Sequence, residues 1–163
     1  NADLEVAKIY RTNQQCFKKL KKKLPKYFLS FPIKKEEIIK TIFDNEKNLE
    51  KITNIIHPEI RKKMNFFLKE NKKENIVILD VPLFLENKLH QNGDIIIFIQ
   101  SKKSEIIKRL KRRNNFNINL FNKFKKIQLP LSYKKKKSQF IIRNDFTNKS
   151  AKLIVKKILN KIL

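Results

Sequence analysis

Glycine is almost absent from this sequence, in which Gly93 is the single glycine among 163 residues. Glycine normally makes up about 7% of a protein. Loops that cradle phosphate groups need several glycines, because their backbone N–H groups must approach the anion closely. The sequence accordingly contains neither a GxGxxG fingerprint nor a GxxxxGK loop. It begins at Asn1 rather than at methionine, and we expect that an N-terminal piece precedes it.

Soft metal ligands and long apolar runs are also scarce. Cys16 is the single cysteine and has no partner for an internal disulfide, as is typical of proteins in a reducing compartment. Together with His57 and His90, the only histidines, it leaves too few ligands for a structural zinc site. No run approaches the ~20 apolar residues that span a bilayer, and no signal-peptide pattern is present. We expect a cytoplasmic protein without a membrane partner.

Negative charge is in short supply, with 15 acidic against 40 basic residues and a net charge of +25. Such a field attracts polyanions, among them nucleic acids, anionic membrane faces and phosphorylated metabolites. Only six of the basic residues are arginines, and lysine matches base edges and bidentate phosphate contacts poorly. Lysine, asparagine and isoleucine are all abundant, as an AT-rich coding sequence would make them. The simpler interpretation is a biased composition on a solvated surface.

The spacing of apolar residues predicts an α/β protein with a parallel sheet. We expect a helix, continuous or broken, over 2–23 and another over 34–43. Leu49, Ile52 and Ile56 share the face of a further helix, which His57-Pro58 interrupts before the next helix begins. The remaining predicted helices cover 104–113, 116–127, 131–137 and 151–162. Strands are predicted at 76–81, 94–99 and 139–143, the first two of them buried on both faces.

Acidic side chains stand at two places where chemistry is possible. Asp80 and Glu86 flank the end of the 76–81 strand. Ligands of open α/β sheets bind outside the carboxyl ends of strands, which makes these acids candidate metal or substrate contacts. The alternative is an acid at a helix N-terminus, favoured by the helix dipole. Asp3 stands where a loop enters a helix, and an N-cap is the default interpretation there.

Basic and amide side chains mark a second candidate region. Arg109 and Arg113 lie one helical turn apart. Either both side chains reach an oligophosphate, or they are simply basic residues at the end of a helix, where they complement the helix dipole. Asn144 follows the last predicted strand, where its amide either reads a base edge or forms a turn.

In their order and intervals these elements resemble the dephospho-coenzyme A kinase family of P-loop kinases. The resemblance runs through essentially the whole chain, and the matching elements are A-D at 2–3, the apolar segment 38–43, I-I-H-P-E-I at 55–60, D-V-P-L-F-L-E at 80–86, K-R-L-K-R-R at 108–113, Q-L-P at 128–130, Lys134 and F-I-I-R-N at 140–144. The family's first strand, glycine-rich phosphate loop and following helix, a unit of roughly 30 residues, are not in this sequence. Lys35, Gln139 and Asn1 stand where the family usually has arginine, aspartate and aspartate.

The resemblance implies a P-loop-kinase-like core, in which a parallel sheet carries helices on both faces and a helical lid, with its first strand or strands missing from this chain. It implies a single domain over 1–163. Within it, 24–72 is a helical subregion on the coenzyme A side, 108–137 is the lid, and the remainder is the core.

The resemblance also implies a reaction, the last step of coenzyme A biosynthesis. ATP donates its γ-phosphoryl group to the ribose 3′-hydroxyl of dephospho-coenzyme A, giving coenzyme A and ADP. Asp3 matches the aspartate that accepts the hydroxyl proton. Arg113, with Arg109 nearby, matches the lid that closes on ATP, and Asn144 matches the adenine side of the site. The basic surface is then explained by two polyanionic substrates, without a specific nucleic-acid partner.

Further residues are assigned by the same resemblance. The residues expected to bind dephospho-coenzyme A are Lys35, His57, Pro82 and Glu86. His57 is expected to hold the geometry of its segment rather than to transfer a proton. Mg²⁺ would bridge the β- and γ-phosphates, held partly by a hydroxyl of the absent loop. No direct metal ligand is assigned, and Asp80 is expected to lie next to the metal ion and contact its ligands rather than the ion itself.

Two alternatives from other classes remain open. A nucleic-acid-binding module would use the lysine surface, although helix-turn-helix, zinc-finger and aromatic RNA-binding signatures are all absent. A non-catalytic relative would keep the fold without the loop, although such a protein has no need of the matches at Asp3, Arg113 and Asn144. Without the phosphate loop we expect residues 1–163 alone to be inactive and poorly stable. The sequence makes no prediction of the oligomeric state.

Overall fold

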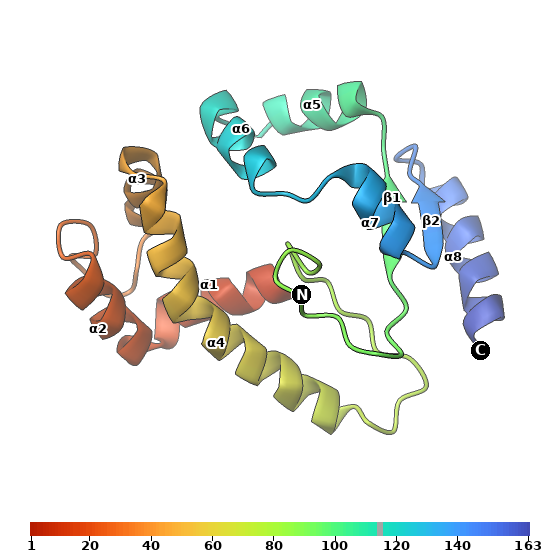
Figure 1. The fold of residues 1–163 in the computed structure, drawn as a ribbon, viewed down its shortest axis with the longest axis horizontal. Coiled ribbons are helices and arrows are strands. Elements are labelled where there is room, and N and C mark those ends of the chain that lie inside the picture. Colours follow the sequence, from red (N-terminus) through yellow and green to blue (C-terminus); the bar gives the residue numbers. More distant parts are fainter. Residues whose placement is uncertain (114–115) are drawn as a thin grey trace. The chain divides into compact units, whose positions relative to one another are not determined.

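The computed structural model describes residues 1–113 and 116–163, and for Leu120 the backbone alone. It divides into two compact units, Asn1–Pro82 (unit 1) and Leu83–Leu163 (unit 2). The predicted lid, 108–137, therefore lies partly outside the described residues. Each unit is built around its own elements and is described in turn (Figure 1).

Unit 1 is helical. It contains α1 (Ala2–Thr12), α2 (Gln14–Lys23), α3 (Lys35–Asp44) and α4 (Lys47–Glu70). The predicted helix over 2–23 is broken at Asn13, which ends α1 and caps α2 by accepting a 2.9 Å hydrogen bond from the Cys16 N–H. The helices α1, α2 and α3 all contact α4. The buried core of the unit is formed by side chains of these helices together with Phe28 from the connection between α2 and α3, and the helical members include Ile9, Cys16, Leu20, Ile42, Ile52, Ile56 and Ile60.

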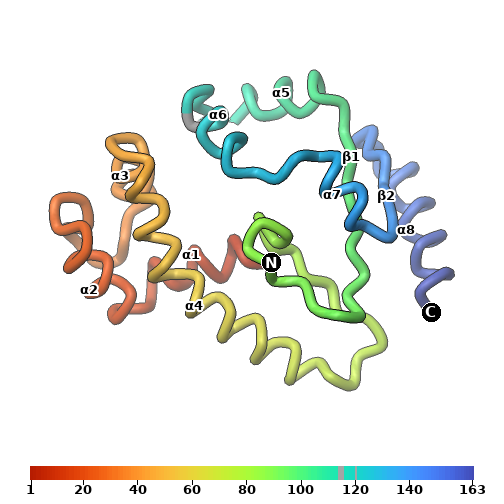
Figure 2. The backbone as a smooth tube through the Cα atoms, viewed as in Figure 1, coloured from red at the N-terminus to blue at the C-terminus, as the bar shows by residue number. Residues whose placement is uncertain are grey.

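The predicted interruption at His57-Pro58 is wrong, because α4 runs without a break from Lys47 to Glu70 (Figure 2). A proline inside a helix removes one backbone hydrogen bond and costs about 3 kcal/mol. Ile52, Ile56 and Ile60 lie on one face of α4 and are all buried. Burial of each such side chain contributes about 1.5–3 kcal/mol, which outweighs the cost of the missing bond.

The predicted strand at 76–81 is also wrong. The segment is extended but pairs with no strand in the described part of the chain, and Ile78 is 79% exposed. Its backbone contact is with the start of α1, where the Ala2 N–H donates a 2.8 Å hydrogen bond to the Asp80 carbonyl. A strand is stabilised by a ladder of backbone hydrogen bonds, and an apolar run by itself does not supply the neighbouring strand.

Unit 2 contains the sheet. Strand β1 (Ile97–Gln100) pairs in parallel with β2 (Phe140–Arg143), with Ile97 opposite Phe140 and Gln100 opposite Arg143. Between them run α5 (Lys103–Lys111), α6 (Ile118–Lys126) and α7 (Leu131–Lys137), and α8 (Asn148–Ile162) follows β2 and packs on it. The predicted α/β class and parallel pairing are confirmed, with two strands rather than three among the described residues.

Gln139 helps to set the register of this sheet. Its side-chain carbonyl accepts a 2.7 Å hydrogen bond from the Ile96 N–H, and its backbone N–H donates to the Ile96 carbonyl at 3.0 Å.

The helices of the described ranges include none long and apolar enough to cross a membrane.

Candidate active site

The carboxyl ends of β1 and β2 border a hollow of about 490 Å³ in unit 2, which we call the strand-end hollow. Its lining residues are Gln100, Ser101, Lys102, Glu105, Arg143, Asn144, Asp145 and Phe146. Parallel strands place their carboxyl ends at the same edge of a sheet, and the loops that follow them create a crevice there. Asn144 lies in this crevice, where the sequence places it.

Asn144 forms a turn at the end of β2. Its backbone N–H extends the sheet by donating to the Gln100 carbonyl at 2.8 Å, and its side-chain Oδ1 accepts a 2.8 Å hydrogen bond from the Phe146 N–H. Of the two interpretations that the sequence leaves open, the turn is therefore confirmed. The contact with a nucleotide base stays a prediction.

Arg109 lies on α5, and its guanidinium carbon is 4.0 Å from the centroid of the Phe146 ring. The predicted helix over 104–113 ends earlier, at Lys111, so Arg113 follows the helix rather than sharing a face with Arg109. The Arg113 N–H donates to the Leu110 carbonyl at 3.0 Å, and its side chain is exposed. Both cations are thus open to solvent at the end of α5.

Asp145 organises the turn that leads into α8. Its Oδ1 accepts hydrogen bonds from the Ser150 hydroxyl and from both the N–H and the hydroxyl of Thr147. These bonds, of which that from Ser150 contributes most, lower the pKa of Asp145 to about 2. The carboxylate is therefore ionised at neutral pH and is occupied in holding the loop.

Glu86 binds within unit 2. Its Oε1 lies 2.6 Å from Nζ of Lys134 on α7 and accepts a 3.0 Å hydrogen bond from the Leu129 N–H. Burial by itself would raise the pKa of Glu86, but the hydrogen bonds from Lys134 and from backbone N–H groups lower it on balance. Glu86 therefore carries a negative charge that joins the segment after Pro82 to α7. Its contact with substrate stays a prediction, and Pro82 itself is exposed.

The start of α1 is joined to the extended 76–81 segment in unit 1. Asn1 caps the helix, its Oδ1 accepting a 3.2 Å hydrogen bond from the Leu4 N–H, and its amide nitrogen donates to Oδ2 of Asp80 at 2.7 Å. Asp3 is therefore not the N-cap: it lies in the first turn of α1, with its side chain exposed. A carboxylate in this position is favoured by the helix dipole and stays accessible to a bound molecule.

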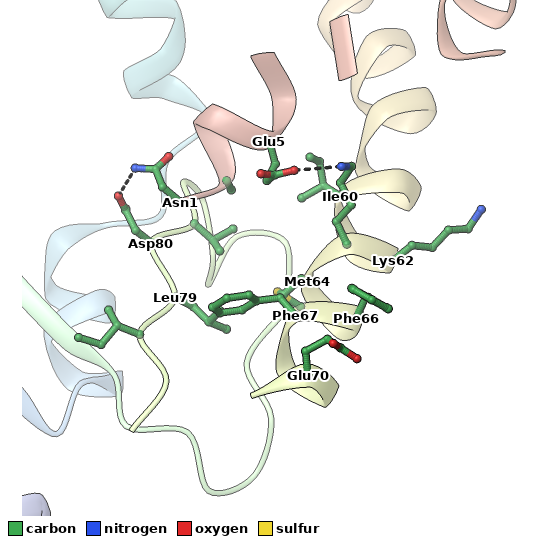
Figure 3. Close-up of a pocket in the computed structure, with 14 residues that line it drawn as sticks. Asn1, Glu5, Ile60, Lys62, Met64, Phe66, Phe67, Glu70, Leu79 and Asp80 are labelled. Carbon is green, nitrogen blue, oxygen red and sulfur yellow. Dashed lines mark hydrogen bonds and ion pairs between the residues drawn. The ribbon is translucent and has the colours of Figure 1, made fainter. Parts of the chain in front are cut away.

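Beside this junction lies a groove of about 620 Å³ that we call the α4 groove (Figure 3). Apolar side chains from α4 and from the extended segment line most of it, among them Met64, Phe67 and Leu79. At its edge Glu5 accepts hydrogen bonds from Lys8 at 2.7 Å and Lys63 at 3.0 Å, and these two contacts lower the pKa of Glu5.

The other predicted substrate residues of unit 1 lie on α3 and α4. Lys35 is the first residue of α3 and is exposed. His57 is partly buried in α4, and burial, followed by the nearby charge of Arg61, lowers its pKa below 6.5. The imidazole is therefore neutral at pH 7, which agrees with a structural role in its segment.

The described residues contain no group of three or more histidine, cysteine, aspartate or glutamate side chains suited to hold a metal. Mg²⁺ in phosphoryl-transfer sites needs few protein ligands, because phosphate oxygens and water complete its octahedron. Asp80, a single exposed carboxylate held by Asn1, fits a role next to such an ion rather than a complete protein site.

Two contacts escaped the sequence analysis. Lys134 is one of the elements that carry the family resemblance, but no spacing rule pairs it, one of 34 lysines, with Glu86. Phe146 was not considered, since an isolated aromatic residue in a loop carries no periodicity. Its position directly after Asn144 and Asp145 was the available signal, because asparagine and aspartate are typical of turns.

A family model and three known proteins that are similar to this chain all carry the same description. The family model described as dephospho-CoA kinase matches residues 1–150. The dephospho-CoA kinase of Wolbachia sp. subsp. Brugia malayi is 27% identical in an alignment that covers 99% of this chain and 84% of that protein. That of Rickettsia conorii is 32% identical over 77% of this chain and 67% of its own length, and that of Bacillus thuringiensis is 32% identical over 74% and 61%.

Proposed function

This chain belongs to the dephospho-CoA kinase family, and from that premise we propose how its residues carry out the reaction. ATP donates its γ-phosphoryl group to the ribose 3′-hydroxyl of dephospho-coenzyme A. The hydroxyl oxygen forms the new bond to phosphorus as the bond to the β-phosphate bridging oxygen breaks, and ADP leaves. The match of the family model to residues 1–150 carries this proposal.

Asp3 is the proposed base for the hydroxyl proton. An exposed carboxylate in the first turn of α1 is reachable by a substrate hydroxyl, and a positioned general base typically contributes about 10²–10⁴ in rate. The hydrogen bonds of Asn1 and Ala2 to Asp80 support this role, because they attach the helix that carries Asp3 to the extended segment.

Arg109, Arg113 and Asn144 are the proposed contacts with ATP. The strand-end hollow supports the placement of the nucleotide base near Asn144, since its volume and its mixed polar lining suit a planar heterocycle. Arg113 is the proposed cation for the transferring group, a role that contributes about 10³–10⁵ in rate in related phosphoryl transfers. Arg109 is proposed to bind the polyphosphate.

Lys35, His57, Pro82 and Glu86 are the proposed contributors to binding of dephospho-coenzyme A. Mg²⁺, when bound, supplies positive charge to the β- and γ-phosphate oxygens. Asp80 is the residue proposed to hydrogen-bond to its water ligands. We also propose that the protein acts in the cytoplasm, which its single cysteine, unpaired within the sequence, supports.

The direct test is turnover. The complete gene product is supplied with ATP and dephospho-coenzyme A, ADP release is followed, and coenzyme A is identified by mass. Residues 1–163 contain no glycine-rich phosphate loop, so the same assay on this segment alone is expected to give no turnover. Full activity of the segment would refute its proposed inactivity, and an inactive complete gene product would refute the proposed function.

A further inference from the structure

Phe146 and Arg109 form a stacked pair in unit 2. The guanidinium carbon lies 4.0 Å from the ring centroid, well inside the ~6 Å range of an effective cation–π contact. The two residues come from different elements, since Arg109 lies on α5 and Phe146 in the loop between β2 and α8. The contact therefore holds the far end of a long side chain against a second segment.

Phe146 combines this contact with an unusual backbone conformation. Its φ angle is +64°, a left-handed value that glycine adopts freely and bulky residues rarely do. The turn enforces it from both sides, because Asn144 Oδ1 accepts from the Phe146 N–H and Asp145 Oδ1 accepts from the Thr147 N–H. Strain of this kind persists only where the surroundings over-determine it.

The position of the pair relates it to the strand-end hollow. Phe146 and Glu105 both line that hollow, and Arg109 lies one turn beyond Glu105 on the same face of α5. An exposed arginine has many accessible rotamers, and ordering it upon binding costs free energy. The Phe146 ring restricts the guanidinium to one region in advance, while the exposed side chain of Arg109 stays accessible to an anion.

We propose that Phe146 is a positioning residue for the nucleotide: its ring holds the Arg109 guanidinium beside the strand-end hollow, oriented for the polyphosphate of ATP. This inference rests on the proposed function, in which Arg109 binds ATP. A purely structural role for Phe146 predicts that stability and ATP binding change together. A positioning role predicts that Phe146→Gly weakens ATP binding without lowering stability, because glycine removes the ring and also relieves the backbone strain.

The test uses initial rates of the complete gene product at saturating dephospho-coenzyme A, together with thermal unfolding. Phe146→Leu is expected to raise KM for ATP by about 2- to 5-fold with kcat nearly unchanged, as loss of an exposed cation–π contact implies. Phe146→Tyr keeps the ring and is expected to retain the original KM. Phe146→Gly is expected to raise KM at least as much as Phe146→Leu without lowering the Tm.

Two comparisons complete the experiment. In an Arg109→Ala background, Phe146→Leu is expected to have no further effect on KM for ATP, since the two residues act as a unit. Phe17→Leu removes a cation–π contact with Lys21 on α2, 5.8 Å from nitrogen to centroid, and is expected to leave KM for ATP unchanged.

The possible failures are distinguishable. An active wild-type protein whose KM for ATP is the same in Phe146→Leu overturns the inference and leaves the proposed function standing. The inference is equally overturned if KM rises and the Tm falls together in both Phe146→Leu and Phe146→Gly. A wild-type protein that neither turns over nor binds ATP overturns the proposed function, and the inference with it.

Discussion

The carboxylate of Glu86 and the ammonium of Lys134 lie 2.6 Å apart, with side chains only 11% and 19% exposed. Because the two residues are far apart in the sequence, their ion pair connects the segment after Pro82 to α7. Low exposure strengthens the attraction and also makes either charge costly when its partner is removed.

Glu86→Gln is expected to destabilise the protein by about 2 kcal/mol, because it leaves the Lys134 ammonium partly buried without its counter-charge. Lys134→Met is expected to have a similar effect, and the double variant to cost less than the sum of the two. Denaturant unfolding of the three variants measures this coupling. A raised KM for dephospho-coenzyme A in Glu86→Gln without loss of stability would favour a direct substrate contact instead.

Asp3→Asn in the complete gene product is expected to lower kcat by about 10²–10⁴ while KM for both substrates changes little. The amide keeps the size of the side chain but accepts no proton. Steady-state kinetics provide the measurement, and Glu74→Gln is the matched control, since it neutralises an exposed carboxylate outside the proposed sites. Equal losses in turnover and in binding would remove Asp3 from the role of base.

His57 is expected to make stability depend on pH. Its pKa is below 6.5 in the folded protein, chiefly through burial, and near 6.5 in the unfolded chain. Between the pKa of His57 in the folded protein and its pKa in the unfolded chain, the unfolded state therefore binds more protons. The free energy of unfolding falls as the pH is lowered from 7 through this range. Unfolding measured from pH 5 to 8 should show this slope, and His57→Gln should reduce it. An unchanged slope in the variant would assign the dependence to another group.

Pro58→Ala is expected to stabilise the protein by about 2 kcal/mol. The substitution restores a backbone N–H inside α4, a gain of about 3 kcal/mol that the greater freedom of the unfolded chain partly offsets. Thermal unfolding and far-ultraviolet dichroism measure the effect. A lower Tm would show that α4 depends on the geometry that the proline imposes.

Much of the local structure could be predicted from residue patterns. The amphipathic stripe over 151–162 became α8, and the apolar run before Arg143 became β2. Asn13, which has an intrinsic preference for caps, broke the first helix where the pattern allowed a break. In each case the signal was a local preference that the surrounding structure did not oppose.

The errors came where a neighbour decided the outcome. The apolar run at 76–81 has the pattern of a buried strand, yet it lacks a paired strand among the described residues. Pro58 carries a signal for a helix boundary, but the buried face of α4 overrides it. Asp3 had the residue type of a cap, and Asn1, two residues earlier, took the position.

For the candidate site, the sequence by itself determined which residue types stand at the ends of the elements: Asp3 after Asn1, Arg109 near the end of α5 and Asn144 after β2. These positions follow from the spacing of residues, because the periods of helices and strands fix where each residue of the sequence lies along its element. Only the tertiary structure decided that Glu86 meets Lys134 and that Arg109 stacks on Phe146. Contacts between distant segments depend on how the elements pack, and no local preference of a residue contains that information.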